Sequence, residues 1–229
     1  MITERQSEIL KNVVREYINS AQPVSSQLLE KKRGFSVCPA TIRSEMQRLT
    51  DKGYLLQPYT SAGRVPTDKG YRFFVDDLVQ KKIDGLNEDF NIEIESSLKI
   101  IQSVTRFLAS ESSNLALGYL FEERILWKEG WEEILQEPEF KESEFVSGFT
   151  NLLREFEEKV EDFKEEEGIK IYIGRENPFR KSRDFSAIIT RCFLPNKEEG
   201  VFAILGPTRM NYEKNIGSLN YLIKFLEEN

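Results

Sequence analysis

Side chains that can hydrogen-bond to the edges of nucleic-acid bases gather in one short segment of the chain. Ile42, Met46 and Leu49 follow the i, i+4, i+7 spacing of a helix that buries one face in a core. The other faces of this predicted helix carry hydroxyl, amide and guanidinium groups, which read base edges in a DNA major groove. The base-reading and groove-lining candidates are Thr41, Arg43, Ser44, Gln47 and Arg48. An ordinary solvated helix carries similar residues, so the neighbouring elements must decide between the two interpretations.

The sequence contains few of the residue patterns that enzyme active sites use. The chain has no histidine, which removes imidazole general bases, histidine-activated nucleophiles and histidine-ligated metal sites. Its two cysteines, Cys38 and Cys192, form neither a metal-ligand spacing nor a disulfide framework. Most carboxylates stand in dense, solvated runs such as residues 155–158. We therefore expect no enzyme activity, no cofactor and no bound metal.

Local signals also predict the elements that precede the candidate helix. Thr3 with Gln6 three residues later matches a capping box, so a first helix begins at about Glu4. Ser25 is the predicted N-cap of a short second helix that ends in a run of three cations. These cations are Lys31, Lys32 and Arg33. They either compensate the helix dipole or contact DNA phosphates, and both interpretations remain open.

A short β-hairpin is predicted directly after the candidate helix. Pro39 suits the first turn of that helix, and Gly53 suits its C-terminal cap. Residues 54–59 then predict a first strand, and residues 60–66 the tip and the returning strand. Gly63 permits backbone geometry that other residues resist, and Arg64 supplies a cation at the tip for a phosphate or the minor groove, unless it pairs with a nearby acid. Three helices followed by this hairpin predict a winged helix-turn-helix.

Lysine and arginine outnumber the acidic residues in the first part of the chain only. Residues 1–82 hold fourteen lysines and arginines and nine acidic residues, whereas residues 83–229 hold eighteen lysines and arginines and thirty acidic residues. The net charge of −7 therefore hides a basic module joined to an acidic one, which predicts contact with a polyanion by the first alone. We predict a DNA-binding domain over residues 1–82 and a second domain over residues 83–229. No membrane span and no signal peptide is evident, so we expect a cytoplasmic protein.

Helices of the acidic module follow from its apolar periodicity. Residues 83–89 are polar and contain glycine, which predicts a hinge. An amphipathic helix over residues 92–109 serves either as a dimer element or as a core helix, and both remain open. A long apolar stripe predicts a helix over residues 145–163, and Tyr212 begins a last amphipathic helix.

Strands of the acidic module are predicted from alternating or continuous apolar runs. They cover residues 169–173, 185–193 and 200–206. The last run is almost entirely apolar, which suits a strand at the centre of a sheet. The mixture of helices and strands predicts the α+β fold class.

Two segments of the basic module resemble one family of bacterial regulators. The run Val37-Cys-Pro-Ala-Thr-Ile-Arg-Ser-Glu-Met46 and the run from Leu55 to Arg72, which contains Thr-Ser-Ala-Gly-Arg-Val-Pro-Thr-Asp-Lys-Gly-Tyr, are similar to the heat-inducible transcription repressor (HrcA) family. Residues 173–178 and 206–212 resemble its C-terminal motifs. Cys38 stands where the family usually has serine, and Ser44 where it usually has asparagine. Cysteine is a poor N-cap, so the helix start loses up to about 1 kcal/mol.

The resemblance implies a winged helix-turn-helix followed by a GAF-like regulatory domain. It also implies a repressor of chaperone genes that binds an inverted-repeat operator as a homodimer, releases it on heat stress and is assisted by chaperonin. The chain is shorter than usual members, and we place the missing part between about Ser110 and Leu120, which leaves a reduced GAF-like domain. In residues 206–212 we expect a strand-to-helix turn, with Arg209 bonding to nearby carbonyls, rather than a ligand site.

Two other functions are compatible with the same sequence. A small-molecule-responsive regulator would share the DNA-binding module but would need a cavity in the second domain. A winged-helix protein-interaction module would bind DNA weakly and without regard to sequence. The operator bases, the target genes and the dimer interface are left open. So is the trigger, which is heat, chaperonin availability, a ligand or oxidation of Cys38.

Overall fold

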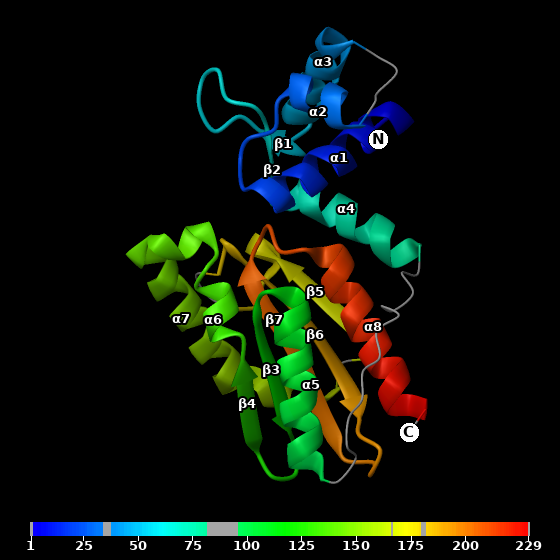
Figure 1. Ribbon diagram of the computed structural model, residues 1–229, viewed down its shortest axis with the longest axis vertical. Coiled ribbons are helices and arrows are strands. Elements are labelled where there is room, and N and C mark those ends of the chain that lie inside the picture. Colours follow the sequence, from blue (N-terminus) through cyan, green and yellow to red (C-terminus); the bar gives the residue numbers. More distant parts are fainter. Residues whose placement is uncertain (1, 34–37, 82–95, 166, 180–181, 229) are drawn as a thin grey trace. The chain divides into compact units, whose positions relative to one another are not determined.

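The chain forms two compact units, Met1–Lys81 and Lys82–Asn229. The structure is a computed structural model, and it describes residues 2–33, 38–81, 96–165, 167–179 and 182–228. Helices and strands are mixed, so the fold class is α+β as predicted (Figure 1). The predicted hinge over residues 83–89 lies outside the described residues. None of the described helices is long and apolar enough to cross a membrane.

Within its described residues, the first unit contains the three predicted helices and the predicted hairpin in the predicted order, followed by a fourth helix. Its elements are α1 (Glu4–Ser20), α2 (Ser26–Arg33), α3 (Pro39–Asp51), β1 (Leu55–Leu56), β2 (Val65–Pro66) and α4 (Asp68–Gln80). The capping box at the start of α1 is confirmed, because Thr3 and Gln6 bond to each other's backbone N–H groups. Ser25 caps α2 by accepting a hydrogen bond from the Leu28 N–H. The apolar faces of the helices meet in a core that includes Ile9, Leu29, Ile42, Leu49 and Phe74.

Both ends of α3 follow from the residues that flank it. Cys38 occupies the N-cap position but its side chain makes no cap hydrogen bond, and Pro39 fills the first turn. At the other end Gly53 adopts a φ of +76°, which favours glycine. The Gly53 N–H bonds to the Thr50 carbonyl and the Tyr54 N–H to the Leu49 carbonyl, which together form a Schellman motif. The chain therefore leaves α3 directly into the hairpin.

The hairpin strands are shorter than predicted. Leu55 pairs with Pro66 and Leu56 with Val65, and only these residues form strands between Tyr54 and Pro66. The returning chain gains a second attachment, because Arg64 and Val24 exchange two backbone hydrogen bonds of 2.8 and 2.9 Å. Gly63 is required by this attachment rather than by an unusual φ, since a Cβ there would lie 2.4 Å from the Val24 carbonyl oxygen.

The second unit is built around one antiparallel sheet with the strand order β4-β3-β7-β6-β5. Its helical elements are α5 (Ser97–Ser112), α6 (Trp131–Ile134), η1 (Pro138–Lys141), α7 (Ser143–Lys159), η2 (Val160–Glu165), η3 (Gly174–Glu176) and α8 (Tyr212–Glu228). Its strands are β3 (Leu115–Leu120), β4 (Ile125–Glu129), β5 (Ile169–Ile173), β6 (Phe185–Phe193) and β7 (Glu199–Pro207). The three predicted strands are confirmed, and β7 lies at the centre of the sheet as its apolar run predicts.

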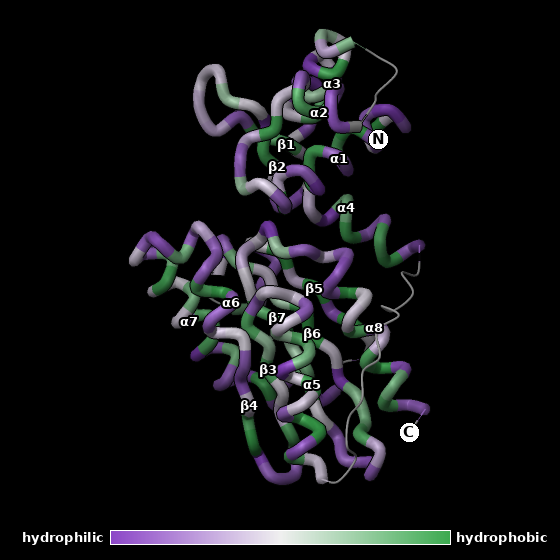
Figure 2. Tube along the Cα trace, in the orientation of Figure 1, coloured by the Kyte–Doolittle hydropathy of each residue, from purple (hydrophilic) through white to green (hydrophobic). Residues whose placement is uncertain are grey.

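Helices cover both faces of the sheet. Helices α7 and η2 cover one face, and α5 and α8 cover the other (Figure 1). Gly118 of β3 lets α5 approach closely, because a Cβ there would lie 2.4 Å from the Ile101 side chain. Hydrophobic residues recur along the strands between these layers (Figure 2). The central strands are therefore buried on both faces.

Two strands of this unit were not predicted, and one predicted helix is described only in part. Helix α5 begins at Ser97, because the extended Ser96 is its N-cap and accepts a hydrogen bond from the Lys99 N–H, and residues 92–95 of the predicted helix lie outside the described residues. Strands β3 and β4 were not predicted. The six residues of β3 are all buried, so they show no alternation that would distinguish a strand from a buried helix.

Candidate nucleic-acid interface

The structure divides α3 into a buried face and an exposed face. Ile42, Met46 and Leu49 are buried in the core of the first unit, as predicted. The candidate base-reading residues lie on the remaining surface, where Thr41 is half-buried and the other four are exposed. Those four are Arg43, Ser44, Gln47 and Arg48. The helix therefore presents one continuous hydrogen-bonding surface to solvent.

Arg43 and Ser44 are the two candidates with uncommitted side chains. Among the described residues, neither makes a side-chain hydrogen bond or an ion pair. Arg43 also lines a small cleft beside Gly63 and Arg64, where α3 meets the hairpin. A guanidinium in this state can donate two parallel hydrogen bonds without first breaking an internal contact.

Arg48 is tied to a carboxylate that the sequence analysis did not single out. Its Nη1 donates to Glu45 Oε1 at 3.0 Å, and the Gln6 amide donates to the other carboxylate oxygen at 2.7 Å. Glu45 is only 7% exposed and Gln6 only 2%. The signal for Glu45 was available, since it lies on the same helix face as Ile42 and Leu49. A buried acid of this kind anchors α3 to the start of α1.

Arg64 does not stand at the tip of the hairpin. The tip is the turn from Tyr59 to Ala62, closed by an Ala62 N–H to Tyr59 carbonyl bond of 3.0 Å. The Arg64 side chain folds back onto α3, where Nη2 donates to Gln47 Oε1 at 2.8 Å and Nε donates to Thr50 Oγ1 at 3.1 Å. The tip position expected for this cation is therefore wrong. Its side-chain partners are the Gln47 amide, the Thr50 hydroxyl and the carbonyls of Ala62 and Gly63, instead of an acid.

The cations at the end of α2 differ in their surroundings. Lys31 is exposed and makes no ion pair with a described residue. Lys32 is already paired with Glu16, whose side chain is only 4% exposed, so this cation compensates a buried acid. Arg33 ends α2, and its side chain lies outside the described residues. Lys31 is therefore the phosphate-contact candidate of this cluster that is exposed and without an ion pair among the described residues.

Cys38 stands exposed at the start of α3. Its Sγ lies 3.4 Å from Thr41 Oγ1. Hydrogen bonding to the Thr41 side chain, followed by that to its backbone, lowers the pKa of the Cys38 thiol. The contact joins the N-cap to one of the groove-lining candidates.

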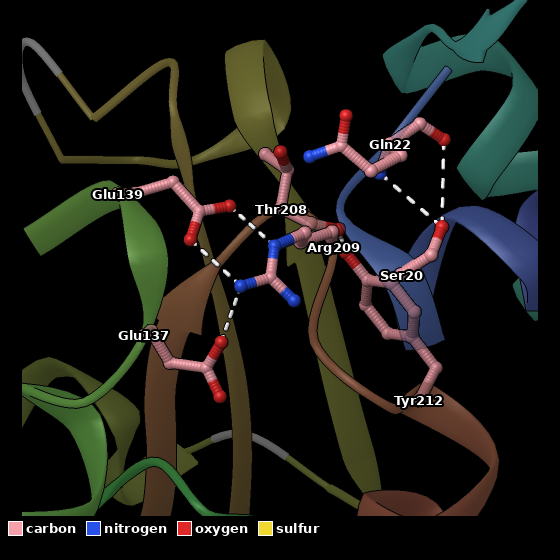
Figure 3. Close-up of polar contacts among 7 residues, drawn as sticks. All are labelled: Ser20, Gln22, Glu137, Glu139, Thr208, Arg209 and Tyr212. Carbon is pink, nitrogen blue, oxygen red and sulfur yellow. Dashed lines mark hydrogen bonds and ion pairs between the residues drawn. The ribbon is translucent and has the colours of Figure 1, made fainter.

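Arg209 in the second unit is held by two carboxylates (Figure 3). Its Nη2 donates to Glu139 Oε2 at 2.7 Å, and the same guanidinium contacts Glu137. Burial alone lowers the pKa of Arg209, but the bonds and charges of Glu139 and Glu137 outweigh it and raise that pKa. The expected turn between β7 and α8 is present, but the expectation of carbonyl partners missed these two carboxylates. They join the η1 segment to the end of β7.

Comparison with known proteins agrees with the resemblance found in the sequence. The family model described as the HrcA protein C terminal domain matches residues 67–216. The heat-inducible transcription repressor HrcA of Thermodesulfovibrio yellowstonii is 28% identical, with 99% of this chain and 97% of the relative covered. That of Carboxydothermus hydrogenoformans is also 28% identical, with 100% and 98% covered. A crystal structure titled as a hypothetical protein at 2.2 Å resolution matches with a TM-score of 0.81 and 21% identity over 100% of this chain and 98% of the other. This last match shows the fold alone.

These matches place the chain in the class of transcription repressors, which is not a class of enzymes. It belongs to the HrcA family, whose C-terminal domain model covers more than half of its residues. It is a shortened member. The alignment with the Thermodesulfovibrio yellowstonii repressor spans 338 positions, whereas this chain has 229 residues. At least 109 positions of that alignment (338 − 229) therefore have no residue from this chain.

Proposed function

We propose that the chain is a sequence-specific DNA-binding repressor of heat-shock genes, with a winged helix-turn-helix in residues 1–82 and a reduced GAF-like domain in residues 83–229. The exposed hydrogen-bonding face of α3 is the observation that carries this proposal. The order of helices and hairpin around α3 supports it, as does the basic charge of the first unit. The chromosome is the partner, so the protein works in the cytoplasm.

Helix α3 enters the major groove and reads base edges. Arg43 is the leading reader, because its guanidinium is unpaired among the described residues and matches the two acceptors of guanine. Ser44 adds a short hydroxyl contact, and Thr41 lines the groove. Arg48 keeps its bond to Glu45 and reaches a neighbouring base or phosphate with its remaining donors. Lys31 contacts the backbone and fixes the register without reading sequence.

The repressor binds an inverted repeat as a homodimer. Two first units related by a two-fold axis place their α3 helices in successive major grooves, about 34–36 Å apart. Each half-site then binds weakly alone and tightly as part of the pair, since the second contact is intramolecular. A loss of dimerisation on heating would therefore release the operator. Chaperonin assists recovery of the active fold.

The second unit fits release of the operator without a ligand better than it fits release controlled by a small molecule. Arg209, the cation in the family-like motif between β7 and α8, is occupied by Glu137 and Glu139. A guanidinium with two carboxylate partners has no net charge to offer an anionic ligand. Marginal stability of the shortened unit, instead of ligand occupancy, then sets the temperature of release.

The test measures discrimination between DNA sequences. A labelled inverted repeat from the chaperonin promoter of the source organism is titrated by fluorescence anisotropy beside scrambled DNA, over a salt series and up to the unfolding temperature. We expect at least about a thousandfold preference for the repeat and a steep salt slope. Arg43→Ala should remove most of the preference. Equal and weak binding to both duplexes, unchanged in Arg43→Ala, would leave a protein-interaction module as the better description.

A further inference from the structure

Gln47, the amide on the exposed face of α3, is held from two sides. Its Oε1 accepts a 2.8 Å hydrogen bond from Arg64 Nη2, and its Nε2 donates a 2.8 Å hydrogen bond to Asp51 Oδ1. An amide turned over by 180° would place its NH₂ against the guanidinium and its oxygen against the carboxylate. Both contacts therefore select the same orientation. The second Nε2 proton meets no acceptor among the described residues, so it is available to face outward.

Arg64 is itself fixed at both ends. Its backbone is bonded to Val24 through two hydrogen bonds of 2.8 and 2.9 Å, and Gly63 leaves the space for that approach. Its Nε donates to the Thr50 hydroxyl, whose own proton is donated to the Met46 carbonyl. The Arg64 guanidinium, which comes from the returning strand of the hairpin, is thus held against α3 by hydrogen bonds. A cation that only contacts a phosphate does not need these bonds.

From this geometry we infer that Arg64 is a positioning residue for base recognition and not a phosphate contact. It fixes the Gln47 amide so that the free Nε2–H faces a hydrogen-bond acceptor on a base edge. A free glutamine pairs with adenine N6 and N7 through its oxygen and its nitrogen together. In this chain the Arg64 guanidinium already donates a hydrogen bond to that oxygen. The hairpin therefore contributes to sequence selectivity through α3, an inference that rests on the proposed DNA-binding function.

The experiment begins with a duplex selected by the wild-type chain from a random-sequence pool. Single base-pair variants of this duplex identify the pair whose preference is lost in Gln47→Ala. Arg64→Lys keeps the charge but loses the planar fork. We expect it to lose the preference at that same base pair, about tenfold or more, with the salt slope unchanged. In a Gln47→Ala background, Arg64→Lys should have no further effect on that preference.

A phosphate contact gives the opposite pattern. Arg64→Lys would then keep the base preference, and Arg64→Ala would weaken binding to all duplexes equally while reducing the salt slope by about 0.9. That result would overturn the inference. Lys31→Ala serves as the matched control, since Lys31 is exposed and unpaired among the described residues and should show this phosphate pattern. A wild-type chain that selects no sequence at all would instead contradict the proposed function.

A measurement without DNA guards against variants that fold poorly. The side-chain amide protons of Gln47 are followed by NMR in the free protein, in wild type and in Thr50→Val. The valine keeps the shape of the residue and removes the hydroxyl that accepts from Arg64. We expect the shift separation of the two Gln47 amide protons to move to that of a free glutamine side chain when Arg64 is released. Identical Gln47 signals in wild type, Thr50→Val and Arg64→Lys would show that Arg64 does not hold the amide.

Discussion

The side-chain amide of Gln6 donates a 2.7 Å hydrogen bond to the carboxylate of Glu45, which fastens the first turn of α1 to the middle of α3. The same Gln6 accepts from the Lys52 ammonium at 2.9 Å and caps its own helix together with Thr3. The buried Gln6 side chain therefore makes three separate contacts, with Glu45, with Lys52 and with the backbone at Thr3. The contact with Glu45 fixes the orientation of α3, the candidate recognition helix.

Gln6→Ala should destabilise the first unit by about 1–3 kcal/mol, because the buried Glu45 loses a donor that water cannot replace. Chemical unfolding monitored by circular dichroism measures this loss. Gln27→Ala is the control, since Gln27 is exposed on α2 and should change stability by less than about 0.5 kcal/mol. Equal effects of the two substitutions would contradict a structural role for the Gln6–Glu45 bond.

Cys38→Ser should stabilise the start of α3. The cysteine makes no cap bond to the helix, whereas a serine hydroxyl at an N-cap accepts from the second or third N–H group. We expect a gain of about 0.5–1 kcal/mol, measured by thermal unfolding under reducing conditions. Cys38→Ala should give no gain. If alanine stabilised the protein as much as serine, the missing cap would not be the cause.

Asp77→Asn should weaken the first unit at neutral pH and not in acid. Burial tends to raise the pKa of Asp77, but hydrogen bonds from Lys11 and Lys81 outweigh it and lower that pKa. A carboxylate with a lowered pKa stabilises the folded state above its unfolded pKa, and this contribution disappears as the pH falls through the folded value. We expect a loss of about 1 kcal/mol at pH 7.

Unfolding of wild type and Asp77→Asn at several pH values tests the sign. The difference between them should shrink steadily as the pH falls below about 4. Asp76→Asn is the control, because Asp76 lies one residue away with a side chain that is 55% exposed. A difference that grew in acid would reverse the expected linkage.

Arg209→Ala should destabilise the second unit more than any exposed charge change. It leaves Glu137 and Glu139 facing each other without their shared cation, so we expect a loss of about 2–3 kcal/mol. Thermal unfolding of the second unit measures it. Lys224→Ala is the control, since Lys224 forms an exposed pair with Glu228 and should cost under about 0.5 kcal/mol. If Arg209→Ala were as stable as Lys224→Ala, the contacts of Arg209 with Glu137 and Glu139 would not hold η1 in place.

Local sequence signals determined much of the fold. The capping box at Thr3, the cap at Ser25, the proline at the start of α3 and the glycine at its end all act within a few residues of the chain, so the sequence displays them directly. Apolar periodicity likewise predicted the buried face of α3 and the strands β5, β6 and β7. The family motifs in residues 37–46 and 55–72 added the expected function.

Only the tertiary structure decided what each charged or polar side chain does. Arg64 meets Gln47 seventeen residues away, Gln6 meets Glu45 thirty-nine residues away, and Arg209 meets Glu139 seventy residues away. No periodicity encodes such pairs, because they depend on how completed helices and strands pack. Strand β3 was invisible for a related reason, since burial on both faces removes the alternation that marks a strand. The sequence determined which groups were available for DNA recognition, and packing determined that Arg43 stays unpaired among the described residues while Arg64 is held against α3.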